Sequence, residues 1–154
     1  MAAMNLRILT LLLLPLCFLS RGANAAEGPS APPTEVVFFD HAKVDDAFAK
    51  SLPLLLTTRY KVQTGRRVMP GQVEVHANDT DIFYVTEGTA TLTTGGSAVD
   101  PKTTAPGEVR AEKISGGTKR KLTKGDVIVI PAGIAHQFTE VSGTFLYFVI
   151  KVTK

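Results

Sequence analysis

Short apolar segments, separated by turns rich in Gly and Pro, recur along most of this 154-residue chain. Some alternate apolar with polar residues and others are continuously apolar and β-branched, and both patterns are typical of β-strands. We predict strands over residues 54–62, 72–76, 82–85, 89–94, 109–114, 127–130, 136–141 and 145–152. Residues 97–108, which contain two prolines, predict a loop. Many short strands beside a single helix indicate an all-β sandwich or barrel.

The one predicted helix covers residues 41–51, ahead of the first strand. Asp40 is a good N-cap for it, because its carboxylate can accept a hydrogen bond from a free N–H of the first turn. Val44 and Phe48 are four residues apart and would share the inner face of the helix. His41 lies in the first turn, where we expect it to be a surface residue and not a ligand.

The amino-terminal 25 residues predict a secretory signal peptide. Arg7 supplies a positive start, and residues 8–19 form a mostly apolar run that ends short of the ~20 residues needed to span a bilayer. Residues 23–25, Ala-Asn-Ala, form a cleavage site of the small-x-small type. We therefore expect a periplasmic or secreted protein; an uncleaved membrane anchor is the alternative. After the signal we expect a flexible lead-in over residues 26–35 and one domain over residues 36–154.

Cleavage of this signal would change both the cysteine content and the charge of the chain. It would remove Cys17, the only cysteine, so the mature protein would use no disulfide. It would also remove Arg7 and Arg21, which leaves 15 basic residues against 14 acidic ones. A chain so close to neutral gives no electrostatic reason to expect nucleic acid as a partner. The basic residues 119–121, near Lys124, are interpreted as a solvated hairpin end.

Two segments carry residues suited to chemistry. In the first, Pro131 and Gly133 stop a strand and turn the chain, which aims His136 from the start of the next strand. In the second, Glu74 and His76 share one strand face because side chains alternate along a strand, and Asp81 follows after a short polar bend.

The first of these segments resembles the second sequence motif of the cupin family, G-x5-P-x-G-x2-H-x3-N. Gly125, Pro131, Gly133 and His136 match it at every spacing, and Glu140 stands where the motif ends in Asn. This resemblance implies a double-sheet jelly-roll barrel. The cupin family includes dioxygenases, isomerases, sugar-binding domains and storage proteins, so the fold alone does not select a function.

The upstream segment resembles the first cupin motif, H-x-H-x3,4-E-x6-G, less closely. Glu74, His76, Asp81 and Gly88 fit its spacing, with Glu in place of the first His and Asp in place of Glu. The Gly that should precede the motif is out of register. Asn78 is an alternative to Glu74 as a ligand, since it lies on the same strand face, but it leaves only two residues before Asp81.

The resemblance implies that Glu74, His76, Asp81 and His136 point into the barrel. Polar side chains in an apolar interior are costly unless they are paired or metal-bound. Imidazole and carboxylate ligands suit a divalent ion such as Fe, Mn, Zn or Ni. The same four residues could instead form a hydrogen-bonded cluster without metal, as in degenerate cupins.

Three functions remain open on this basis. The leading hypothesis is an exported metal-binding cupin that acts on or binds a small organic molecule, as an enzyme of the dioxygenase or isomerase type. Glu140 and Tyr84 are further candidates for acid–base roles in it, although strand alternation places one of Phe83 and Tyr84 in the core and the other outside. The second hypothesis is a metal-free ligand-binding or sensing module. The third is a structural homodimer that buries residues 145–150, which are apolar on both faces.

Overall fold

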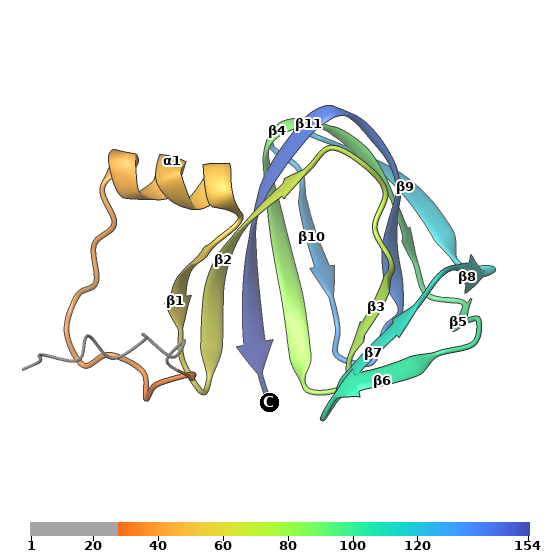
Figure 1. Ribbon diagram of the computed structural model, residues 1–154, viewed down its shortest axis with the longest axis horizontal. Coiled ribbons are helices and arrows are strands. Elements are labelled where there is room, and N and C mark those ends of the chain that lie inside the picture. Colours follow the sequence, from red (N-terminus) through yellow and green to blue (C-terminus); the bar gives the residue numbers. More distant parts are fainter. Residues whose placement is uncertain (1–27) are drawn as a thin grey trace, which may run out of the picture.

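Antiparallel strands wrap around one interior in the computed structural model, which describes residues 28–154 (Figure 1). The predicted signal peptide lies outside the described residues. In chain order the elements are α1 (His41–Lys50), β1 (Pro53–Leu56), β2 (Tyr60–Arg67), β3 (Val73–His76), β4 (Asp79–Thr94), β5 (Ser97–Ala98), β6 (Lys102–Ala105), β7 (Glu108–Ala111), β8 (Ile114–Ser115), β9 (Thr118–Thr123), β10 (Val127–Ile130) and β11 (His136–Thr153). No helix among the described residues is both long and apolar enough to cross a lipid bilayer. The predicted all-β architecture is confirmed.

The last strand, β11, connects three other strands of the barrel. It pairs with β2, β3 and β4, and the described strands form one nine-stranded sheet and a separate β5–β8 ribbon. β4 lies along nearly the whole of β11 on one edge and pairs with β9 and β10 on its other edge. These pairings join residues far apart in sequence. They bring β3 and the two ends of β11 to the same interior.

The apolar half of that interior is built around aromatic side chains from β4 and β11. Phe83, Phe138, Phe145 and Tyr147 are all buried, and neighbouring ring centroids lie 5.3 to 5.7 Å apart. Tilted and edge-on contacts at such distances are favourable for aromatic pairs. Along β11 the inward positions follow the strand period of two, with Phe145, Tyr147 and Val149 buried.

The helix covers part of the outer face of β11. Asp40 Oδ1 accepts from the Lys43 N–H at 2.8 Å, so the predicted N-cap is confirmed. Phe48 packs on Phe148 with ring centroids 4.9 Å apart. The apolar outer side of β11, which the sequence left open for a second subunit, is therefore contacted at this point by the chain's own helix. The lead-in also meets the barrel, since the Thr58 N–H donates to the Ser30 carbonyl at 2.8 Å.

In two segments the observed strand boundaries differ from the predicted ones. Residues 54–62 are not one strand: they contain most of β1 and the start of β2, which are joined by a turn that begins at the fully buried Thr57. The Thr57 hydroxyl accepts from the Tyr60 N–H at 2.9 Å and donates to the Tyr60 carbonyl at 2.6 Å, which fixes the turn. The predicted loop over residues 97–108 contains the short strands β5 and β6, and β6 is exposed along its length.

The two edge strands also correct the sequence prediction. The basic residues 119–121 lie within the regular strand β9, paired with β4, and not in a hairpin end; their side chains are exposed. The continuous apolar, β-branched run of β10 is typical of a buried strand. Among the described strands it pairs with β4 alone, and Val127 and Val129 are 62% and 56% exposed because alternate side chains of an edge strand face outward.

Candidate metal centre

The four residues that the sequence singled out lie together inside the barrel, and we call them the ligand cluster: Glu74, His76, Asp81 and His136. Glu74 and His76 come from β3, Asp81 from the start of β4 and His136 from the start of β11. The β3–β11 pairing sets Glu74 directly opposite His136. His76 Nε2 lies 3.3 Å from Glu74 Oε2 and 3.5 Å from Asp81 Oδ2, and His136 Nε2 lies 3.7 Å from Asp81 Oδ2.

Hydrogen bonds fix the orientation of both imidazoles. Nδ1 of His76 lies 2.7 Å from Glu108 Oε2, and Nδ1 of His136 lies 3.1 Å from the Ile134 carbonyl oxygen. Both partners are acceptors, so we assign the ring proton to Nδ1 in each case. Each Nε2 then presents its lone pair to the interior. A carboxylate behind a histidine in this way is a common support for a metal ligand.

The Nε2 atom of His76 is the unsatisfied group of this site. It is buried, and among residues 28–154 nothing hydrogen-bonds it; its 3.3 Å approach to Glu74 lacks hydrogen-bond geometry. A buried acceptor left unpaired costs about 1–3 kcal/mol. Either a proton on Nε2, which would face the carboxylates of Glu74 and Asp81, or a metal ion between the side chains of the cluster would remove that cost.

Three members of the ligand cluster converge closely enough to share an ion. One ligand atom from each of Glu74, His76 and His136 lies within 4.8 Å of the others. Ligand atoms bound to one ion at about 2.1 Å lie no more than about 4.2 Å apart, so small side-chain movements would close the site. Two imidazoles and one carboxylate form a ligand set that suits Fe, Mn, Zn or Ni and leaves coordination positions open.

Asp81 differs from the other three because both oxygens of its carboxylate form an ion pair with a lysine. Lys151 Nζ lies 2.8 Å from Oδ1 and 2.6 Å from Oδ2 of Asp81, which is 1% exposed. The sequence analysis missed Lys151. The signal that could have found it is strand alternation, since Lys151 is the next inward position of β11 after Tyr147 and Val149.

Two arginines, also missed by the sequence analysis, neutralise the other acidic side chains. Arg67 Nη2 donates to Glu74 Oε1 at 3.2 Å, and its Nε donates to the Tyr147 hydroxyl at 3.1 Å. Arg110 Nη1 donates to Glu108 Oε2 at 3.1 Å, and its Nη2 lies 3.6 Å from Glu74 Oε2.

These charges set the protonation of the ligands. Burial raises the pKa of Glu74, but its contact with His76 and the charges of Arg110, His136 and Arg67 outweigh burial and bring the pKa to about 2. Burial lowers the pKa of His136. Burial also lowers the pKa of His76, but its acidic neighbours, Glu74 first, more than compensate, so that pKa is raised. At neutral pH Glu74 is therefore an anion and His136 a neutral base, as metal ligands must be, while a proton competes with metal at His76.

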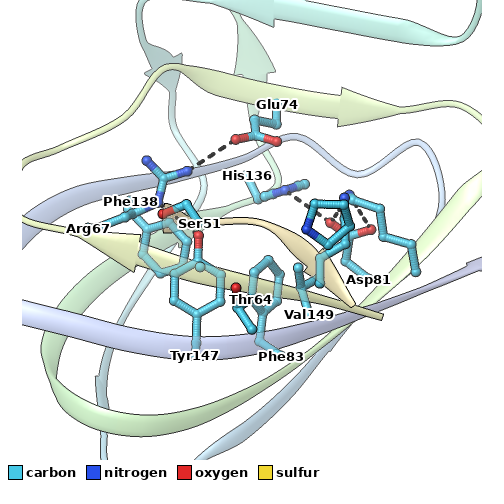
Figure 2. Close-up of a pocket in the computed structure, with 14 residues that line it drawn as sticks. Ser51, Thr64, Arg67, Glu74, Asp81, Phe83, His136, Phe138, Tyr147 and Val149 are labelled. Atoms are coloured by element: carbon cyan, nitrogen blue, oxygen red, sulfur yellow. Dashed lines mark hydrogen bonds and ion pairs between the residues drawn. The ribbon is translucent and has the colours of Figure 1, made fainter. Parts of the chain in front are cut away.

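A cavity of about 190 Å³ adjoins the ligand cluster (Figure 2). Figure 2 shows Glu74, His136 and Asp81 facing it from one side and the rings of Phe83, Phe138 and Tyr147 from another. Arg67 and Lys151 also line it, together with Ser51, which follows α1, and Pro53, the first residue of β1. Because a cavity of about 150 Å³ is enough to hold benzene, the space suits a small organic molecule.

The remaining candidates lie elsewhere. Glu140 is exposed outside the barrel and accepts from the Thr91 hydroxyl at 2.6 Å. Tyr84 is 45% exposed on the outer face, while Phe83 beside it is buried, as strand alternation predicted. Neither Glu140 nor Tyr84 lines the cavity, so neither can contact a ligand held there, and the structure does not support the acid–base roles considered for them. Asn78 is exposed and outside the ligand cluster.

Comparison with known proteins identifies the family. Residues 31–154 match the family model described as Cupin. Among solved structures, BH2720 from Bacillus halodurans has a TM-score of 0.55 and 14% identity, over 83% of this chain and 87% of that one. TT1209 from Thermus thermophilus has a TM-score of 0.48 and 18% identity, over 67% and 81%. No curated protein matches the chain. The family match confirms the jelly-roll barrel inferred from the two motifs, and the chain belongs to the cupin family.

Proposed function

We propose that this cupin binds one divalent metal ion through Glu74, His76 and His136 and uses it to bind or act on a small organic molecule in the adjoining cavity. The observation that carries the proposal is the buried Nε2 of His76, which lacks a partner among the described residues and faces a carboxylate and a second imidazole. When bound, such an ion supplies Lewis-acid chemistry to a ligand oxygen.

The residues that hold the two imidazoles support this role. Glu108 holds the His76 ring so that Nε2 faces inward, and Ile134 does the same for His136. His76, Asp81 and His136 are buried, which strengthens the electrostatic contacts among them. An enzyme of the dioxygenase or isomerase type would depend on this ion, so metal content is the first measurement.

One observation favours the metal-free alternative. Each carboxylate of the site already has a protein cation beside it, as in a ligand-binding module that needs no ion: Lys151 at Asp81, Arg67 at Glu74 and Arg110 at Glu108. That arrangement leaves His76 Nε2 unsatisfied, and we therefore prefer the metal site.

Metal titration with matched variants distinguishes the metal site from the metal-free ligand-binding module. Mature protein, residues 26–154, is analysed for metal content and titrated with Mn, Fe, Zn and Ni. We expect about one equivalent, with affinity reduced more than about 100-fold in His76→Ala and His136→Ala, because even residues behind a ligand cost 10–100-fold. His41→Ala is the matched control, since His41 is exposed and paired with Asp45. Well under one equivalent of every metal, with no thermal stabilisation, would refute the proposal.

The same titration tests the choice between Glu74 and Asn78. Glu74→Gln preserves size but removes the charge, so its metal affinity should fall steeply, whereas Asn78→Ala should bind like the parent protein. The opposite order would place the ligand at Asn78. All measurements use one pH, because ligand protonation competes with metal.

We also propose that the protein is exported, on the support of the sequence of residues 1–25. Amino-terminal sequencing of protein recovered from the periplasm or medium, with Ala26 as the first residue, would support export. Recovery of the uncleaved chain from the cytoplasm would contradict it.

A further inference from the structure

The charges around the cavity balance before any metal is added. Among the described residues, three acidic side chains are paired with three basic ones: Arg67 and Arg110 with Glu74, Arg110 also with Glu108, and Lys151 with Asp81. The partners lie 2.6 to 3.6 Å apart, and none of the six side chains is more than 30% exposed. The histidine ligands are neutral when they bind metal, so they add nothing to this sum.

A divalent ion would therefore bring two positive charges that the protein does not offset. Buried charge without a counter-charge is strongly unfavourable. If the acidic ligands had no basic partners, they would neutralise the ion themselves. Here the acidic side chains are already paired with basic ones, so the metal-loaded site would carry a net positive charge that an anionic ligand can neutralise.

The cavity also offers donors placed to receive an anion. Lys151 lines it, and the two Asp81 contacts engage at most two of its three N–H groups. The Tyr147 hydroxyl accepts from Arg67, which leaves its own proton for a ligand oxygen. Gly65 makes room for this ring, because a Cβ there would lie 2.2 Å from Cζ of Tyr147.

The walls of the cavity indicate an organic anion. Between the charged groups they are formed by Phe83, Phe138 and Val149, which are buried and apolar and suit a carbon skeleton. A cavity of about 190 Å³ has space for a small carbon skeleton of about the size of benzene, which fits a cavity of about 150 Å³.

We propose that the ligand of this site is a small organic carboxylate, bound by Lys151 and the Tyr147 hydroxyl beside the metal. The proposal rests on the metal site proposed above for the charge that the ligand balances. Lys151 and Tyr147 act as binding residues that select an anion over a neutral analogue.

Calorimetric titration of the metal-loaded mature protein tests this directly. The probes are acetate and malonate, with acetamide as the neutral analogue of acetate and inorganic phosphate as an anion without a carbon skeleton. We expect binding of the carboxylates, at least 10-fold weaker binding of acetamide and weaker binding of phosphate. Equal affinity for acetamide, or tighter binding of phosphate, would overturn the inference.

Two variants locate the binding groups. Lys151→Met removes the ammonium group and should weaken carboxylate binding at least 10-fold while metal affinity is kept or increased, since a nearby positive charge is gone. Lys119→Met, at an exposed lysine of β9, is the control. Tyr147→Phe keeps the ring and should weaken carboxylate binding several-fold, and it decides the matter if Lys151→Met does not fold. Unchanged carboxylate affinity in a folded Lys151→Met or Tyr147→Phe protein would contradict the assignment.

Metal binding is measured separately in every sample, so the two proposals can fail separately. Normal metal uptake without carboxylate binding overturns this inference and leaves the metal site standing. Absence of metal uptake overturns the metal site. Absence of metal uptake also overturns this inference, because without the ion the paired charges of the cavity already cancel and leave no positive charge for a carboxylate to balance.

Discussion

Removing the carboxylate behind His76 tests the metal centre without touching a ligand. In the Glu108→Ala variant, Nδ1 of His76 loses its acceptor at 2.7 Å, so the ring can rotate or bind its proton at Nε2. Loss of such a supporting carboxylate typically lowers metal affinity 10–100-fold, which corresponds to about 1.4–2.7 kcal/mol. Glu108→Gln retains an acceptor oxygen but not the charge, and we expect its affinity to lie between those of Glu108→Ala and the parent protein.

Competition against a chelator of known affinity, at one pH, measures these differences. Glu112→Ala is the control, because Glu112 is a nearby exposed acid whose observed hydrogen bond uses its backbone carbonyl. Circular dichroism confirms that each variant is folded. If Glu108→Ala binds metal as tightly as the control, the Glu108 contact does not prepare His76 as a ligand, and the reasoning from the orphaned Nε2 fails with it.

Three further predictions concern stability. In protein freed of metal by a chelator, the ionised Glu74 carboxylate stabilises the folded state at pH values above its unfolded pKa of 4.5. Folding lowers that pKa to about 2, so up to about 3 kcal/mol of the free energy of unfolding is lost as the pH falls from 4.5 towards 2. Urea titrations at pH 6, 4 and 2.5 should show this slope, and Glu74→Gln should flatten it. Gly65→Ala should cost about 1–3 kcal/mol in urea unfolding, because the added methyl group collides with the Tyr147 ring; unchanged stability would contradict that contact. Asp40→Ala should cost about 1 kcal/mol in the same assay, as loss of an N-cap does, and no cost would mean that the cap is dispensable.

Local patterns were sufficient for much of the fold. Asp40 capped the helix as predicted because capping depends on residues within one turn. Alternation placed Phe83 inside and Tyr84 outside because the period of a strand is fixed by its backbone. The same rule put Glu74 and His76 on one face of β3, and the turn at Gly133 directed His136 towards them.

Properties that depend on strand neighbours could not be read in this way. Val127 and Val129 belong to a continuous β-branched run, which is typical of a strand buried on both sides. Both side chains lie on the outer face of the sheet, which is uncovered here: Tyr84, opposite Val127 on the non-edge strand β4, is also exposed. Lys151 was missed for a similar reason: its contact with Asp81 spans 70 residues of sequence and belongs to no motif.

Lys151 also bears on how the degenerate first motif would bind the metal ion that we propose. The motif normally has a His where this chain has Glu74, and a Glu where it has Asp81. Asp81 is one methylene shorter than Glu, and Lys151 holds both of its oxygens. Glu74 meanwhile supplies a carboxylate at the position of a neutral imidazole. The two departures offset each other, since one acidic ligand is withdrawn by Lys151 and another is added beside His76. The metal site that we propose would thus have a single carboxylate and two imidazoles as ligands, and Lys151 would lie beside the proposed anionic ligand.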